Sequence, residues 1–218
     1  MLSLEAVDVS IKSVRILRGV RLRIAPGQMA GLIGRNGAGK TTLMRAVIGA
    51  LPVAGGTIAV DGRPVETLAA HARARIGIGY MPEDRGLVPE LTVEENILLP
   101  LWVRRGLVEG ERLAIVHRAI PELIEMRTRR ALLLSGGQQK LVALARALAA
   151  GTRLLLLDEP FEGVAPALAK RLGEVIASLK GSGVSVLIAQ SDLNHARRLV
   201  DTEIVVERGA NVPGWVRM

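Results

Sequence analysis

The architecture of this chain is set by one short stretch, Gly34-Arg35-Asn36-Gly37-Ala38-Gly39-Lys40-Thr41. It fits the pattern G-x-x-x-x-G-K-[ST] without a gap, with an apolar run before it (29–33) and a helical pattern after it (40–48). Glycines let such a loop wrap so that several backbone N–H groups converge on one anion, and the helix start adds its positive dipole end. The stretch therefore predicts a strand, a phosphate-binding loop and a helix.

The side chains at the end of this loop predict what it binds. Lys40 can reach the β- and γ-phosphates of a nucleoside triphosphate, and the Thr41 hydroxyl can ligate Mg²⁺. Lys40 is therefore a candidate catalytic residue as well as a ligand. All residues of the loop, together with Thr42, are candidate nucleotide-binding residues.

Outward from the loop, strands and helices alternate. Alternating apolar and basic residues over 20–24 predict a half-exposed strand, and 57–60 predicts a strand entering a hairpin turn. The pattern is helical from 92 to 149. Further strands are predicted at 76–80, 154–157, 184–189 and 204–207, and further helices at 166–180 and 192–200. Such alternation favours a parallel sheet covered by helices, hence an α/β fold.

A second motif follows the most apolar strand. Four consecutive leucines (154–157) predict a strand buried on both faces, and Asp158 and Glu159 come directly after it. Ligands of open α/β sheets bind at the carboxyl edge of the strands, so both carboxylates are expected beside the phosphate-binding loop. There Asp158 would hold Mg²⁺, directly or through water. Glu159 would act as general base on the water that attacks the γ-phosphate.

A third motif is Leu134-Ser135-Gly136-Gly137-Gln138-Gln139. Ser135 is the predicted cap of the helix that follows, and Thr92 with Glu95 predicts a capping box farther upstream. A hydroxyl, glycines that expose N–H groups and a helix N-terminus together predict a second anion site. Its candidate ligands are Ser135, Gly136, Gly137 and Gln138.

Composition excludes several classes of protein. Of the 218 residues 49% are hydrophobic, which is enough for a sizeable core and too apolar for a disordered chain. The chain contains no Cys, so disulfides and thiolate metal sites are excluded. The sequence has neither an apolar run of about 18 to 20 residues nor the pattern of a secretory signal, which favours a protein of the cytoplasm.

The charge balance points to no particular partner. A formal net charge of +8 would suit nucleic acid or an anionic membrane surface, but the arginines are scattered along the whole chain. The aromatic residues are Tyr80, Trp102, Phe161 and Trp215, too few for a platform on which single-stranded nucleic acid could stack. Nucleic acid is therefore not an expected partner.

In their order, the three motifs resemble those of the ATP-binding-cassette ATPases, and the resemblance covers essentially the whole chain. It implies a RecA-like P-loop NTPase core with an antiparallel β subdomain and an inserted α-helical subdomain. The chain would form one cassette domain, 1–218, with its core at 1–83 and 151–218 and the helical subdomain at about 84–150.

The resemblance also implies partners and a location. Two cassettes, identical or sister chains, pack head to tail in this family, so the element from Ser135 to Gln138 would cap the ATP held with Mg²⁺ by the other chain. ATP hydrolysis would drive transport by separate transmembrane permease subunits. The cassette would be peripheral, at the cytoplasmic face of the inner (plasma) membrane.

Two segments are most similar to one subset of the family. Residues 91–96, LTVEEN, and 163–166, GVAP, resemble the ATPases of importers for branched-chain amino acids and related urea or amide solutes. The short chain resembles the smaller of the two ATPases in those systems. Two alternatives share the motifs: an exporter cassette for lipid or lipopolysaccharide, and a soluble cassette acting on nucleic acid or the ribosome.

At three positions the sequence departs from the family pattern. Ile11 stands where an aromatic residue usually stacks on adenine, which leaves the preference for ATP over GTP open. Glu83 stands at the position of a glutamine and could still reach the Mg²⁺ shell. Gln190 stands at the position of a histidine. Its amide can donate to the γ-phosphate but cannot shuttle a proton near neutral pH, and we keep it as a candidate catalytic residue.

Overall fold

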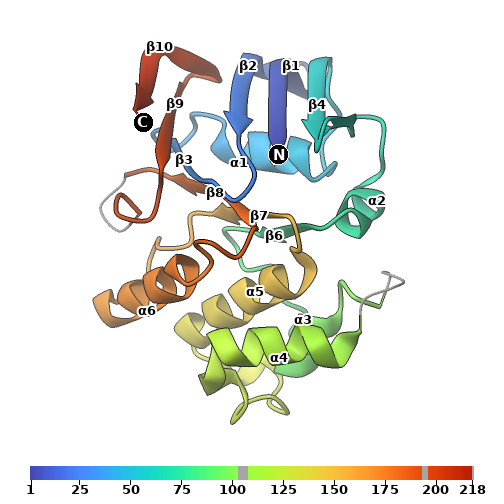
Figure 1. Ribbon diagram of the computed structural model, residues 1–218, viewed down its shortest axis with the longest axis vertical. Helices are drawn as coiled ribbons and strands as arrows, with labels where there is room; N and C mark the ends of the chain where they lie inside the picture. The colour runs from blue at the N-terminus through green and yellow to red at the C-terminus, as the bar shows by residue number, and fades with distance from the viewer. Residues whose placement is uncertain (103–107, 193–195, 218) are drawn as a thin grey trace.

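Two β-sheets form the frame of the molecule, in a computed structural model that describes residues 1–102, 108–192 and 196–217 (Figure 1). One sheet is antiparallel with the strand order β2-β1-β4-β5, and the other has the order β10-β9-β3-β8-β7-β6. The first contains β1 (Leu2–Ile11), β2 (Val14–Ile24), β4 (Gly55–Val60) and β5 (Arg63–Pro64). The second contains β3 (Met29–Ile33), β6 (Ile78–Met81), β7 (Leu154–Asp158), β8 (Ser185–Gln190), β9 (Thr202–Glu207) and β10 (Ala210–Arg217).

The centre of the six-stranded sheet is parallel. Strands β6, β7, β8, β3 and β9 run in one direction, and every residue of β7 and β8 is buried. This is why residues 154–157 of β7 and 186–189 of β8 are continuous apolar runs. Ile33 pairs with Gln190, and Asp158 pairs with Ala189, so the carboxyl ends of three neighbouring strands meet at one edge of the sheet.

Helices cover this sheet on both faces. They are α1 (Lys40–Val47), α2 (Ala70–Arg75), α3 (Val93–Leu98), α4 (Glu109–Ala119), α5 (Gly136–Ala150) and α6 (Pro166–Ala177), with short 3₁₀ turns at Pro121–Leu123 and Ala131–Leu133. One apolar core joins the two sheets and α1, and the other joins the opposite face of the parallel strands with α3, α4, α5 and α6. Helices α3, α4 and α5 lie together at the far end from the antiparallel sheet (Figure 1). In the described parts of the chain no helix has the length and apolar content needed to cross a membrane.

The α/β class and most of the predicted elements are confirmed. The predicted capping box at Thr92 is present, and the predicted cap Ser135 forms a capping box as well. Thr92 and Ser135 each accept a hydrogen bond from the N–H three residues on, and the side chain of that residue bonds back. The predicted helix over 192–200 is wrong where it can be assessed, because 196–199 form a turn; 193–195 lie outside the described residues. The tail has no readable motif, yet its backbone forms β10, which pairs antiparallel with β9.

A buried arginine holds α1, the helix that follows the loop predicted to bind phosphate. Arg73 Nη1 donates to the carbonyl oxygens of Ala46 (2.7 Å) and Val47 (2.9 Å) in the last turn of α1. Its Nε and Nη2 donate to the carbonyl oxygens of Leu68 and Glu66, both at 2.9 Å. Burial lowers the pKa of Arg73. All four hydrogen bonds go to neutral carbonyl groups, and two of these groups lie at the C-terminal end of α1, where the helix dipole is negative.

We expect Arg73→Met, which keeps the apolar stem, to lower the free energy of unfolding by about 2–4 kcal/mol, because two buried and two partly buried carbonyl groups lose their donor. Urea denaturation followed by circular dichroism measures this. Arg18→Met, at an exposed position of β2, is the matched control and should change stability by less than about 0.5 kcal/mol. Equal effects of the two substitutions would contradict the role given to Arg73.

Candidate active site

The loop between β3 and α1 is held against the neighbouring strands. A Cβ on Gly34 would lie 2.3 Å from the carbonyl oxygen of Val206 in β9, so only glycine fits there. Gly34 N donates to the carbonyl oxygen of Gln190 at 3.3 Å, which ties the loop to the end of β8. Gly39, the N-cap of α1, has a φ of 103°, which glycine adopts without strain. The first glycine thus allows the close approach, and the last lets the chain turn into the helix.

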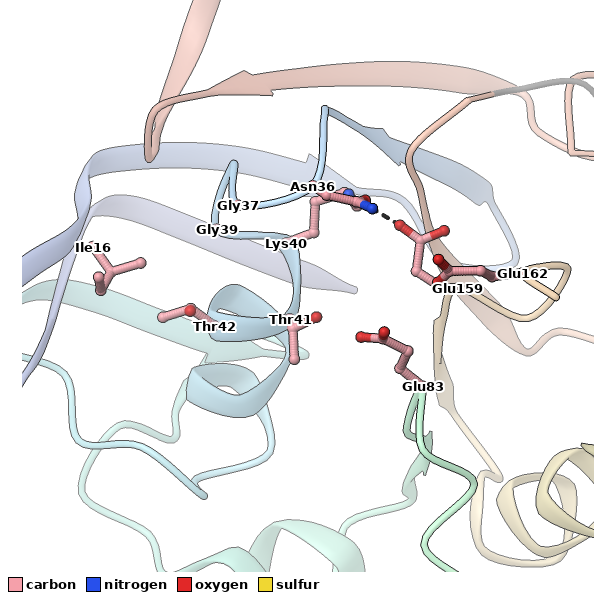
Figure 2. Close-up of a pocket in the computed structure, with 10 residues that line it drawn as sticks. All are labelled: Ile16, Asn36, Gly37, Gly39, Lys40, Thr41, Thr42, Glu83, Glu159 and Glu162. Atoms are coloured by element: carbon pink, nitrogen blue, oxygen red, sulfur yellow. Dashed lines mark ion pairs between the residues drawn. The ribbon is translucent and has the colours of Figure 1, made fainter.

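Lys40 lies buried between the loop and the end of β7. Its Nζ donates to the carbonyl oxygen of Gly34 at 2.6 Å and lies 3.0 Å from Oε1 of Glu159, with both side chains at most 5% exposed. Figure 2 marks this ion pair. A buried ion pair is costly to assemble, and removing one partner leaves the other charge uncompensated. The ammonium therefore already lies at the loop predicted to bind phosphate, and it forms an ion pair with one carboxylate.

Glu159 has one oxygen that is held and one that is available. Oε2 accepts from Ser191 N at 3.2 Å and, in the orientation of Gln190 that satisfies both of its amide atoms, from that amide at 3.3 Å. Oε1 contacts Lys40 at ion-pair distance, but the angle does not make a hydrogen bond, and no other partner exists within the described residues. The φ of Glu159 is 46°, a strained conformation that recurs at functional sites. In that orientation of its amide, Gln190 joins Ser191 N in holding Oε2 of Glu159.

Asp158 is buried beside the loop and receives two hydroxyl groups. Thr41 Oγ1 donates to Oδ1 at 3.2 Å, and the Tyr80 hydroxyl donates to Oδ2 at 3.1 Å. Burial raises the pKa of the Asp158 carboxyl, as do the nearby carboxylates of Glu83 and Glu159, while the two hydrogen bonds oppose the rise. Burial and the Asp158 charge raise the pKa of Tyr80.

The donor set around Asp158 fits a magnesium ion that keeps several waters. The Glu83 carboxylate points across the pocket toward the Thr41 hydroxyl (Figure 2), and Thr41 touches Asp158, so three oxygen-bearing side chains face one region. The described residues contain no group of three His, Cys, Asp or Glu side chains arranged to hold a metal alone. Mg²⁺ commonly binds through one or two carboxylates, with water and nucleotide phosphates as its other ligands, so this set suffices.

Lys40, Thr41, Glu83 and Glu159 face one pocket with a volume of about 440 Å³ (Figure 2). It is lined by Ile16, Asn36, Gly37, Gly39, Lys40, Thr41, Thr42, Glu83, Glu159 and Glu162. Gly34, Arg35 and Ala38 belong to the same loop but do not line the pocket, and neither do Asp158 and Gln190. Its aliphatic wall is Ile16, whereas Ile11, 40% exposed at the β1–β2 hairpin, is not among the lining residues. Sequence reasoning missed Ile16 and Glu162, because their place depends on how β2 and the loop after β7 pack.

The residues of the third motif lie elsewhere. Ser135 and Gln138 bond to each other's backbone N–H at the start of α5, at 3.3 and 3.0 Å. They line a second hollow, also of about 440 Å³, with Gly136, Gly137, Lys140, Leu141, Arg85 and the segment 163–165 with Leu168. No described residue lines both hollows. One chain therefore does not bring its two predicted anion sites together.

Comparison with known proteins identifies this arrangement. The family model of the ABC transporter matches residues 17–162. The lipopolysaccharide export system ATP-binding protein LptB of Haemophilus influenzae is 34% identical over 211 residues, 96% of this chain and 88% of that protein. The high-affinity branched-chain amino acid transport ATP-binding protein BraG of Pseudomonas aeruginosa is 34% identical over 209 residues, 96% of this chain and 90% of that protein.

Solved structures share the fold. The dimeric structure of a post-hydrolysis state of the ATP-binding cassette MJ0796, bound to ADP and Pi, superposes with a TM-score of 0.87. Its sequence is 25% identical, and the match covers 97% of this chain and 96% of that one. The RecA-like core with an antiparallel sheet, expected from the sequence, is confirmed as a cassette fold.

The raised pKa of Asp158 predicts a pH-dependent stability in the absence of nucleotide. A carboxyl whose folded pKa lies above its unfolded value, 3.8, costs stability as the pH rises through that window. We expect Asp158→Asn to be more stable than the parent at pH 7 in urea denaturation, with an advantage that shrinks toward pH 4.

Asp8→Asn is a control for which the expected change in stability at pH 7 has the opposite sign. The hydrogen bond from Arg15 lowers the pKa of Asp8, so this carboxylate stabilises the fold above its unfolded pKa and loses that effect in acid. Asp8→Asn should therefore be less stable than the parent at pH 7, with a deficit that shrinks in acid. A loss of stability in Asp158→Asn that does not vary with pH would contradict the account of Asp158.

Proposed function

From the premise that this chain belongs to the ABC transporter family and is one of its ATP-binding ATPase subunits, we propose that it works as half of a cassette dimer beneath a transmembrane permease. One observation supports the proposed dimer most directly: the pocket at Lys40 and the hollow at Ser135 are separate within one chain. Two chains packed head to tail would join each pocket to the other chain's hollow. The dimeric form of the related cassette MJ0796 supports this arrangement.

In the proposed site, ATP binds with its phosphates in the loop 34–42. The Lys40 ammonium, now held by the Gly34 carbonyl and by Glu159, would turn to the β- and γ-phosphates, which offer it more negative charge. Thr41, Asp158 and Glu83 would hold Mg²⁺, largely through water. The bound Mg²⁺ would supply charge neutralisation at the β- and γ-phosphate oxygens.

Glu159 is proposed as the general base. Its Oε2 is fixed by Ser191 N and the Gln190 amide, which leaves Oε1 to accept a proton from the attacking water once Lys40 has turned to the phosphates. Gln190 orients this carboxylate and can donate to the γ-phosphate. Ile16 would contact the base of the nucleotide, and an aliphatic contact of this kind discriminates weakly between adenine and guanine.

For the direction of transport and the solute, we propose import of branched-chain amino acids or a related small polar solute. The segments LTVEEN and GVAP (91–96 and 163–166) and the similarity to BraG favour this reading. Export of lipopolysaccharide is the second candidate, because LptB is equally similar at 34% identity. In both cases the cassette would lie at the cytoplasmic face of the plasma membrane, with an identical or sister cassette, and without nucleic acid.

We expect Glu159→Gln to bind MgATP with normal affinity and to hydrolyse it about 10²–10⁴-fold more slowly, because the water loses its base. The variant should accumulate as an ATP-bound dimer. Phosphate release and light scattering after size exclusion measure the two effects. The control is Glu125→Gln, an exposed carboxylate remote from the pocket, which should hydrolyse ATP at the parent rate. Normal turnover by Glu159→Gln would remove Glu159 from the role of base.

The partners can be tested directly in the native cell. The tagged chain, extracted with its membranes in mild detergent, should co-purify with permease subunits that span the membrane several times. A solute-binding protein and a second cassette among them would support import. Components of a lipopolysaccharide export pathway would contradict import and support the second candidate, and ribosomal partners without a permease would contradict both.

A further inference from the structure

One short segment of the chain reaches both hollows. The loop that follows β6 contributes Glu83 to the pocket at Lys40, and two residues later it contributes Arg85 to the hollow at Ser135. Within one chain these are separate places. In the dimer proposed above, on which this inference rests, they would belong to two different bound nucleotides.

The Arg85 guanidinium lies over the first turn of α5. Its Nη1 donates to Gln139 Oε1 at 2.9 Å, and the Gln139 amide is oriented by the Ala131 carbonyl, to which its Nε2 donates at 3.0 Å. A Cβ on Gly136 would lie 3.3 Å from Arg85 Nη2, so the glycine leaves room for the guanidinium. The guanidinium is thereby held beside the exposed N–H groups at the helix start.

The backbone of Arg85 is held by a second arginine. Arg146 Nη2 donates to the carbonyl oxygen of Arg85 at 2.7 Å, and its Nη1 donates to that of Gly86 at 2.6 Å. Arg85 itself has a φ of 69°, a conformation that a residue with a Cβ adopts only when its surroundings impose it. The loop therefore presents Arg85 in one direction, toward the hollow.

Two cationic side chains, Arg85 and Lys140, line this hollow, and no described carboxylate is among its lining residues. Arg85 has no ion-pair partner within the described residues, and the helix start adds the positive end of its dipole. Lys140 is buried nearby, with Nζ bonded to the Glu162 carbonyl at 2.6 Å; burial lowers its pKa, and the Arg85 charge lowers it further, while Glu162, Glu159 and Glu83 oppose this. An anion with several oxygens would complete this site.

We propose that Arg85 contacts the phosphates of the ATP bound to the partner chain, beside Ser135 and Gly136, and that this contact closes the dimer. A guanidinium suits this role because its planar set of donors can bond two phosphate oxygens at once. The loop 82–86 then joins the two sites: Glu83 lies at the Mg²⁺ region of its own chain, and Arg85 lies at the partner's γ-phosphate.

The test uses ATP-driven dimerisation in the Glu159→Gln background, so that hydrolysis does not disturb the equilibrium. We expect Arg85→Gln, introduced into this background, to raise the dissociation constant of the dimer by about 10- to 100-fold, the range for loss of a hydrogen bond to a charged group. Binding of ATP to the monomer should change less than about twofold, and the salt dependence of dimerisation should become shallower. Arg85→Lys should restore part of the affinity. Sedimentation velocity at several salt concentrations measures these quantities.

Two controls separate this role from a structural one. Gln139→Leu removes the hydrogen bond that Arg85 makes to α5 but keeps its charge, and Arg118→Gln removes an exposed charge on α4. Arg118→Gln should dimerise as well as the background. Gln139→Leu, which frees the guanidinium but keeps its charge, should be impaired less than Arg85→Gln. Arg85→Gln that dimerises normally, or Gln139→Leu that is equally impaired, would overturn the proposal for Arg85 alone. A Glu159→Gln background that stays monomeric with ATP would refute the dimer itself, and Arg85's role with it.

Discussion

The buried pair between Lys40 and Glu159 is the interaction on which the rest of the site depends. It joins the loop after β3 to the residue after β7 at 3.0 Å, across a sheet edge that the parallel register of β3, β8 and β7 creates. Two charges taken out of water are stable only while they face each other or an equivalent partner. A bound triphosphate is such a partner for Lys40, so nucleotide binding would free Glu159 for proton transfer and link occupancy directly to catalysis.

The separation of the two hollows explains why a single chain would be a poor enzyme. The pocket at Lys40 and the hollow that carries Ser135 and Arg85 share no described lining residue, so one chain does not place both around one nucleotide. The free energy of phosphate binding can then stabilise the association of two chains. A ligand shifts such an equilibrium only by its differential affinity for the closed state, and contacts from the partner's Ser135 and Arg85 would supply that difference. Hydrolysis would remove them, and the dimer would reopen.

Local chemistry accounts for what the sequence predicts well. Some features depend only on residues close together in the sequence, so they can be predicted without knowing the fold. They are the glycine spacing in 34–41, the helix caps at Thr92 and Ser135, and the leucine run 154–157. The misses depend on tertiary contacts. Ile16 reaches the pocket because β2 packs beside the loop. The backbone of β10 forms a strand because it pairs with β9. The backbone of Arg85 is held by Arg146, a residue of α5 that is 61 positions later in the sequence. The division into a core at 1–83 and 151–218 and helices at 84–150 stays a prediction.

The central claim, that a working site needs two chains, is tested most directly by the concentration dependence of turnover. The ATPase rate per chain should be measured at saturating MgATP across about a thousandfold range of protein concentration. Two-chain catalysis predicts that the rate per chain falls steeply on dilution and that a chemically cross-linked dimer keeps its full rate. A rate per chain that stays constant for the uncross-linked protein, while sedimentation shows it to be monomeric, would contradict the account.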